Sequence, residues 1–430
     1  MHRRSDTQRP RPRARVSTST FLAAALAGLS LMPLASRPAA AAPKPRGDEL
    51  AERRERAITK ARAWLDDHVF ALAESEGTPR KPFTVALYGL IELKSRGPTR
   101  EARRRDGAAA KARRYLEHWL DVVEARAAKP AELPPRHGLA SSRHLVQYTW
   151  PAALAMWFLA EADTSVARAR APRSSLRRLA QLLADAQDEN GGFGHGRINP
   201  LPQGADDGLP FDVPLGYPST LVSSTYVVLA ALGHARERLG PAIDGVGQRA
   251  VDHLVASQLP EGLQPYDTSQ RSAHRDPTGV PRAAGAAYAL HAWGVPWTHR
   301  HQVRALQQVD DHVDMLSEGH GSSMLGLWFG ALLARARGPR AWAAFRKAHL
   351  PALLDGQRDD GRLPCPCRGD TFGATDDDEP IPGMAASMPG VFRDGTDAYV
   401  TALGTLILLL DRDDGASAAP ERPRGDVTPR

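Results

Sequence analysis

Histidine, arginine, tyrosine and aspartate side chains gather in three long polar segments of this 430-residue chain. Such residue types serve general acid–base catalysis and the binding of polar groups. An aspartate that is partly buried beside a second carboxylate has a raised pKa and can act as an acid, with its neighbour as the base. Single loop charges are usually solvated, so residue type alone assigns no role. The candidates for a site are His195, Arg197, Asp207, Asp212, Tyr266, Asp267, Asp394 and Asp397.

The chain has two cysteines, Cys365 and Cys367, in the string LPCPCRGD. A pair separated by one proline closes a very small ring, so we expect a local disulfide or inert thiols. Structural zinc needs two more ligands at a compatible spacing, and His349 and Asp370 form no such pattern. We therefore expect neither a metal nor a cofactor.

Twelve stretches with helical spacing of apolar residues position the polar segments, and they pair into six hairpins. The paired ranges are 57–73 with 83–94, 108–127 with 145–162, 174–187 with 223–237, 248–258 with 283–292, 301–315 with 322–335, and 342–357 with 397–410. First helices are amphipathic and charged, as in ITKARAWLDDHV, whereas second helices are apolar, as in SSTYVVLAAL. Exposed first helices and buried second helices predict a closed double ring. We thus expect an all-α fold, an (α/α)6 toroid.

Three first helices end in a glutamine followed by a polar turn and glycine: QDENGGF, QLPEGL and QRDDGRL. Gln187, Gln258 and Gln357 lie where the last carbonyls of a helix lack partners, so each amide is expected to donate to one of them. The glycines Gly191, Gly192, Gly262 and Gly361 permit a left-handed turn, against which the next apolar side chain packs. These residues are interpreted as scaffold.

Together with the helices SSTYVVLAAL, GAAYALHAW and TDAYVTALGTL, the three glutamine strings resemble repeats of the prenyltransferase and squalene-oxidase (terpenoid cyclase) superfamily. The resemblance covers residues 52–410, is strongest in 174–292 and 342–410, and implies an α/α toroid. It does not extend to the catalytic motifs. Cyclases of the superfamily carry a DxDD-type string, and DDHVD (310–314) and TDDDE (375–379) fail in spacing or context. Protein prenyltransferases hold zinc through Asp, Cys and His, and DGTDAYVT has no Cys.

The ends of the chain have a different character from the helical region. Residues 1–42 combine arginines, an apolar stretch from Phe21 to Ala35 and small residues at Ala39–Ala42, which predicts a signal peptide. Residues 43–51 are expected as a linker, 52–410 as the toroid and 411–430 as a disordered tail. The leader holds seven Arg and one Asp, so it carries nearly all of the net charge of +7. The remainder has no basic excess for nucleic acid, and no later stretch is apolar enough to span a membrane.

Long connections inside the hairpins predict where a site lies. In an up-and-down ring these connections all reach the same end, and long loops there bind or cover something. We expect an exported protein, periplasmic or extracellular, that binds a small molecule, lipid or glycan at this mouth and is neither a terpene cyclase nor a protein prenyltransferase. The alternative is an exported polysaccharide hydrolase or lyase that uses loop carboxylates. A third possibility, an isoprenoid binder, predicts Trp, Phe and Leu around the site without paired carboxylates.

Overall fold

The computed structural model describes residues 47–73, 82–95, 100–127, 149–165, 172–194, 220–266, 279–318, 323–364 and 396–412. The chain divides into Met1–Arg46 and Gly47–Arg430, and every described residue lies in the second unit. His195, Arg197, Asp207, Asp212, Asp267 and Asp394, both cysteines and the expected signal peptide lie outside the described residues. Secondary structure in the described residues is helical, apart from two isolated β-bridges that join Phe193 to Gln187 and to Leu221.

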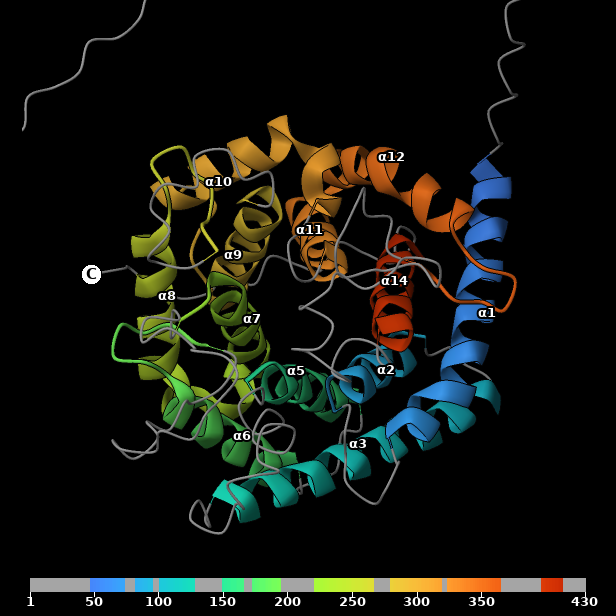
Figure 1. Ribbon diagram of the computed structural model, residues 1–430, viewed down its shortest axis with the longest axis horizontal. Helices are drawn as coiled ribbons and strands as arrows, with labels where there is room; N and C mark the ends of the chain where they lie inside the picture. The colour runs from blue at the N-terminus through green and yellow to red at the C-terminus, as the bar shows by residue number, and fades with distance from the viewer. Residues whose placement is uncertain are drawn as a thin grey trace, which may run out of the picture. The chain divides into compact units, whose positions relative to one another are not determined.

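The inner wall of the unit Gly47–Arg430 is a closed ring of helices (Figure 1). Each helix packs against the next in the order α2, α5, α7, α9, α11 and α14, and α14 packs against α2. Their bounds are α2 Pro82–Lys94, α5 Thr149–Ser165, α7 Val222–Leu239, α9 Gly279–Trp293, α11 Ser323–Arg337 and α14 Thr396–Arg412. The expected toroid is therefore present among the described residues, while the number of hairpins in the whole chain stays a prediction.

The outer wall consists of the first helix of each pair, and it surrounds the inner ring. Its helices are α1 Gly47–Ala73, α3 Arg100–Ala127, α6 Pro172–Ala186, α8 Asp244–Ser257, α10 Arg300–Asp311 and α12 Pro339–Asp355. Each one packs on the inner helix that precedes it around the ring, so that α3 lies on α2 and α1 lies on α14. Two short 3₁₀ helices, Gly240–Ile243 and Val313–Ser317, complete the described elements.

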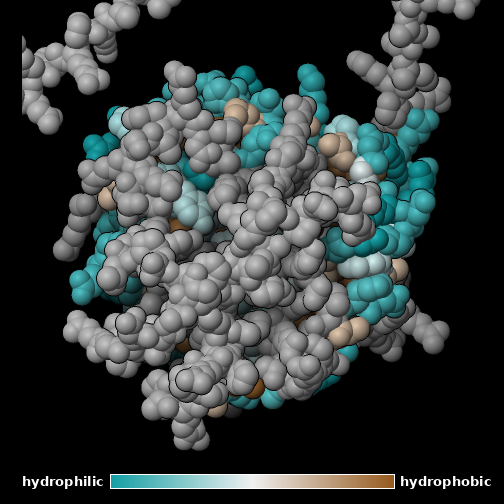
Figure 2. Space-filling model, viewed as in Figure 1, coloured by the Kyte–Doolittle hydropathy of each residue, from teal (hydrophilic) through white to brown (hydrophobic). Residues whose placement is uncertain are grey.

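The two walls differ in burial as their sequences predict. Inner helix α9 is buried continuously from Gly279 to Leu290, whereas outer helix α10 buries only Gln302, Ala305 and Val309. That spacing places a single stripe of α10 against the inner wall and leaves the rest in water. Figure 2 shows the hydrophilic residues of the outer helices around the edge of the view. No helix among the described residues combines the length and hydrophobicity that a membrane crossing requires.

The glutamine turns join neighbouring outer helices. The amide Nε2 of Gln187 donates to the carbonyls of Gly191 (2.8 Å) and Val246 (2.9 Å), and Val246 lies in the first turn of α8. Gln258 makes the same pair of bonds to Gly262 (3.2 Å) and His301 (2.9 Å), and His301 lies in the first turn of α10. The expectation that each amide donates to the last carbonyls of its own helix is therefore wrong. The second hydrogen bond of each amide reaches the next outer helix instead, because the glutamine lies in the turn, beyond the end of its own helix.

The third copy of the turn closes the ring. Gln357 donates to Gly361 (3.0 Å) and to Ala57 (2.9 Å), so the last outer helix is joined to the first. Gly361 has φ 103°, and a Cβ there would lie 2.5 Å from the carbonyl oxygen of Lys60. Both the backbone conformation and the close approach thus require glycine. In the first copy only Gly191 has a positive φ, whereas Gly192 gives room to the His253 ring.

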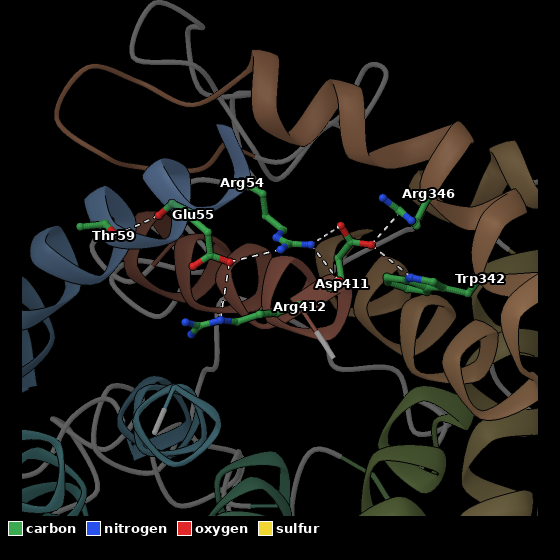
Figure 3. A network of polar contacts seen from close by, with 7 residues as sticks. All are labelled: Arg54, Glu55, Thr59, Trp342, Arg346, Asp411 and Arg412. Carbon is green, nitrogen blue, oxygen red and sulfur yellow. Dashed lines mark hydrogen bonds and ion pairs between the residues drawn. The ribbon is translucent and has the colours of Figure 1, made fainter. Parts of the chain in front are cut away.

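A buried ion pair also joins the first and last helices (Figure 3). The carboxylate of Asp411 accepts hydrogen bonds from Arg54 (2.8 Å) and Trp342 (3.2 Å) and pairs with Arg346 (2.7 Å). Asp411 is 1% exposed, although its position in the sequence suggested a tail. Helix α14 continues to Arg412 because these partners from α1 and α12 satisfy the charge.

Candidate functional site

Two of the candidates predicted from sequence, Tyr266 and Asp397, lie in the described residues. Tyr266 is partly buried ahead of α9; its carbonyl accepts the Val222 amide (3.2 Å), and the Arg282 guanidinium lies 6.0 Å from its ring centre. Asp397 is half exposed in the first turn of α14, where Arg362 donates to it at 2.5 Å. That hydrogen bond is the main reason that the pKa of Arg362 is raised. Because α11 separates α9 from α14 around the ring, the structure does not bring the two residues together.

Aromatic side chains from opposite sides of the inner ring meet at its centre. Trp157 of α5 and Trp328 of α11 stack with ring centres 5.0 Å apart, although α7 and α9 lie between their helices around the ring. Phe329 packs edge-on against both tryptophans, Tyr288 stacks on Trp157, and Tyr226 packs edge-on against Phe329. We call these five residues the central aromatic cluster. Every member is less than 10% exposed, so aromatic side chains fill the ring at this level.

Polar side chains from neighbouring inner helices adjoin the cluster on one side. The Trp157 indole N–H donates to Glu161 (2.6 Å), and Lys94 pairs with the other carboxylate oxygen (3.3 Å). His234 stacks on Trp157 with ring centres 4.1 Å apart; its Nδ1 lies 3.5 Å from Glu161 and its Nε2 lies 3.0 Å from the Tyr288 hydroxyl. We call Lys94, Glu161, His234 and Tyr288 the polar chain. It spans four consecutive inner helices, α2, α5, α7 and α9.

The electrostatics of the polar chain keep Glu161 ionised. Burial acts to raise its pKa, but the charges of Lys94 and His234 and the hydrogen bond from Trp157 outweigh burial and lower it. In the aromatic cluster, burial raises the pKa of Tyr226, and the positive charge of Arg282 opposes part of that effect. The phenol hydroxyl of Tyr226 is consequently neutral at physiological pH.

The inner helices run in the same direction, which places the cluster relative to the two ends of the ring. Trp150 in the first turn of α5 donates to Ser224 in the first turn of α7 (2.8 Å), and Lys94 at the end of α2 meets Glu161 in the last third of α5. The long connections therefore attach at the end where the inner helices begin. The polar chain lies towards the opposite end.

Sequence reasoning missed the polar chain, although a signal was present. It looked for chemistry in the loops, whereas these groups lie inside the apolar second helices, in the strings IELK, FLAE, LGH and AAY. Polar residues are rarely buried without partners, so their recurrence near the ends of successive buried helices was itself informative. Trp157 and Trp328 have the helical spacing of core residues, and both are buried.

No family model and no curated protein matches the sequence. Solved structures similar to this chain include type II terpene cyclase MstE from Scytonema with its substrate geranylgeranyl dihydroxybenzoate, at 14% identity and a TM-score of 0.48. That match covers 85% of this chain and 99% of the cyclase. The apo form of the same enzyme matches at 14% identity and a TM-score of 0.47, over 85% and 98% of the two chains. Similarity at this level says nothing about the activity of this chain.

Proposed function

We propose that this protein is exported and binds a large apolar ligand, of the isoprenoid kind, on the central aromatic cluster, without cyclising it. The ligand enters from the end where the inner helices begin. The stacking of Trp157 on Trp328 supports this proposal most directly, because it brings large aromatic side chains from opposite inner helices together at the centre of the ring. Large aromatic faces contribute much of the binding energy of apolar ligands.

A glycan-cleaving enzyme fits the described residues less well. Cleavage of a glycosidic bond needs two carboxyl groups that face each other, one of them protonated. Asp397 is held by Arg362, and Glu161 is held by Lys94 and Trp157 with a lowered pKa. The string DRDD at 411–414 has the form DxDD, but its first carboxylate, Asp411, is held by Arg54, Trp342 and Arg346, which favours binding over cyclisation.

Binding of all-trans-retinol, a fluorescent polyene, tests the proposal. The purified chain lacking residues 1–42 is titrated with retinol, and saturable enhancement of retinol fluorescence is expected. Trp328→Phe should weaken binding by roughly 2- to 10-fold, since an aromatic pair contributes about 0.5–1.5 kcal/mol. Trp119→Phe is the matched control, because Trp119 is also buried but lies in outer helix α3. Absence of saturable binding, or equal effects of the two variants, would refute the proposal.

Export is tested separately by fractionating cells that express the full chain and sequencing the N-terminus of the product. A mature protein that begins near residue 43, outside the cytoplasm, is expected. A cytoplasmic protein that retains its N-terminus would overturn this part of the proposal and leave the binding site unaffected.

A further inference from the structure

Three consecutive joints of the outer wall each contain a histidine ring, carried by α8, α10 and α12. Each ring places one nitrogen within hydrogen-bond distance of an oxygen at the end of the preceding outer helix: His253 Nδ1 at 3.2 Å from the Asn190 carbonyl, His301 Nδ1 at 2.7 Å from Gln258 Oε1, and His349 Nε2 at 2.7 Å from the Val313 carbonyl. Because each acceptor is an oxygen, the nitrogen that faces it carries the hydrogen. We call these three contacts, which link α6, α8, α10 and α12, the histidine arc.

The second ring nitrogen of His253 is poorly placed to take up a proton. His253 is 4% exposed, and its Nε2 is buried with no hydrogen-bond partner among the described residues. A proton there would put a charged N–H into a site that offers it no acceptor. Burial lowers the pKa of His253 and outweighs the opposing effects of the Asn190 carbonyl and the negative charge of Asp188. The closed joint therefore requires the neutral ring.

Charged neighbours make the same demand on His301. Its Nε2 accepts a hydrogen bond from Nε of Arg300 (3.2 Å), so this nitrogen must keep its lone pair. Protonation would break that bond and add a positive charge close to Arg300 and Arg304. Burial lowers the pKa of His301, and Arg300, His299 and Arg304 lower it further.

The third histidine, His349, is 4% exposed and lies beside Phe345 with ring centres 5.0 Å apart. Burial lowers its pKa, although the hydrogen bond to Val313 and the charge of Asp314 oppose burial. A histidine with a lowered pKa stabilises the fold fully above its unfolded pKa of about 6.5, and this stability is lost as the pH falls below that value. Between about pH 7.5 and 5.5, each histidine that takes up its proton only on opening favours the open form by up to about 10-fold.

Two other joints of the outer wall depend on arginine–carboxylate pairs. Arg178 of α6 pairs with Asp121 and Glu124 of α3, both at 2.6 Å. Arg53 of α1 pairs with Asp355 of α12. Carboxylates ordinarily lose their charge only near about pH 4. Mild acid thus acts on the histidine arc and leaves these pairs intact.

We infer that mild acid loosens the outer wall along the histidine arc, from the turn after α6 to α12, while the joints of α3 with α6 and of α12 with α1 stay closed. The response is local because the three histidines occupy successive joints. Helices α8, α10 and α12 cover the inner helices α7, α9 and α11, so this loosening uncovers one side of the inner ring. The inference goes beyond the proposed function and does not depend on any ligand.

Hydrogen exchange of the purified protein, followed by mass spectrometry at pH 7.5 and 5.5, tests the inference. Exchange times are lengthened at the lower pH to compensate for slower chemical exchange. Amides of α8, α10 and α12 should lose protection by about 10-fold or more, whereas those of α1 and α3 should keep it. Equal loss in all outer helices, or no loss along the histidine arc, would overturn the inference.

A triple variant separates titration of the histidines from general weakness of the joints. His253→Asn and His301→Asn each keep an N–H donor near the Nδ1 position, His349→Gln keeps one near Nε2, and no amide takes up a proton in this pH range. The triple variant should keep its protection at pH 5.5. His68→Asn is the matched control, because Nδ1 of His68 lies 2.7 Å from the carbonyl of Trp64 within α1 and joins no two helices.

The control variant should respond to acid as the unmutated protein does. An undiminished acid response in the triple variant would overturn the inference. Circular dichroism checks that each variant is folded, and the comparison of helices in the unmutated protein decides the matter if the triple variant does not fold.

Discussion

Substitution of Asp411 by alanine should destabilise the protein by several kcal/mol, because it removes one partner of a buried ion pair at the joint between the first and last helices. Loss of one member of a buried pair costs about 3–5 kcal/mol. The lower end applies here for two reasons. Arg54 keeps its 2.8 Å hydrogen bond to the backbone carbonyl of residue 411, and the side chain of Arg346 is 35% exposed, so water can solvate it. We therefore expect a loss of about 3 kcal/mol.

The matched control is Asp310→Ala, which removes another aspartate that is paired with an arginine. The side chain of Asp310 is 53% exposed in its pair with Arg337, so its loss should cost less than about 1 kcal/mol. Urea unfolding of both variants, followed by far-UV circular dichroism and by tryptophan fluorescence, gives the free energies if the two signals coincide. Equal costs for the two variants, or a cost below about 1 kcal/mol for Asp411→Ala, would refute the assignment of this ion pair to ring closure.

Three further predictions concern the glutamine turns and one buried histidine. Gln357→Ala should cost about 1–3 kcal/mol, since it leaves the carbonyls of Ala57 and Gly361 without this donor; an unchanged urea midpoint would contradict this. Gly361→Ala should destabilise by more than about 1 kcal/mol, whereas Gly107→Ala, with open space around it in α3, should stabilise by about 0.5–1 kcal/mol; a shared sign would contradict the packing argument. Burial lowers the pKa of His253 below its unfolded value of about 6.5, so the stability that depends on neutral His253 is complete above that pH and falls as the pH drops below it. Urea midpoints measured from pH 7.5 to 5 should decline less steeply in His253→Gln than in the unmutated chain, and parallel curves would count against this origin.

The alternation of exposed and buried helices could be predicted from the sequence because it depends on local periodicity. An apolar stripe such as that of α10 and a continuous apolar run such as that of α9 need no knowledge of the partner helix. The glutamine turns were recognisable for the same reason, since Gln, Gly and the following apolar residue lie within a few positions of each other. Their role in joining successive outer helices could not be recognised from the sequence, because the second acceptor of each glutamine amide is distant in the sequence.

Only the closed ring decided which residues form the candidate site. Trp157 and Trp328 belong to helices on opposite sides of the ring, and each alone has the spacing of an ordinary core residue. Asp411 has the sequence context of a tail, yet it is buried because Arg54 comes from the other end of the chain. Local sequence determines the type and the buried face of each helix. Contacts between distant segments, which depend on ring closure, determine which side chains meet at the centre and which ionisable groups find a partner there.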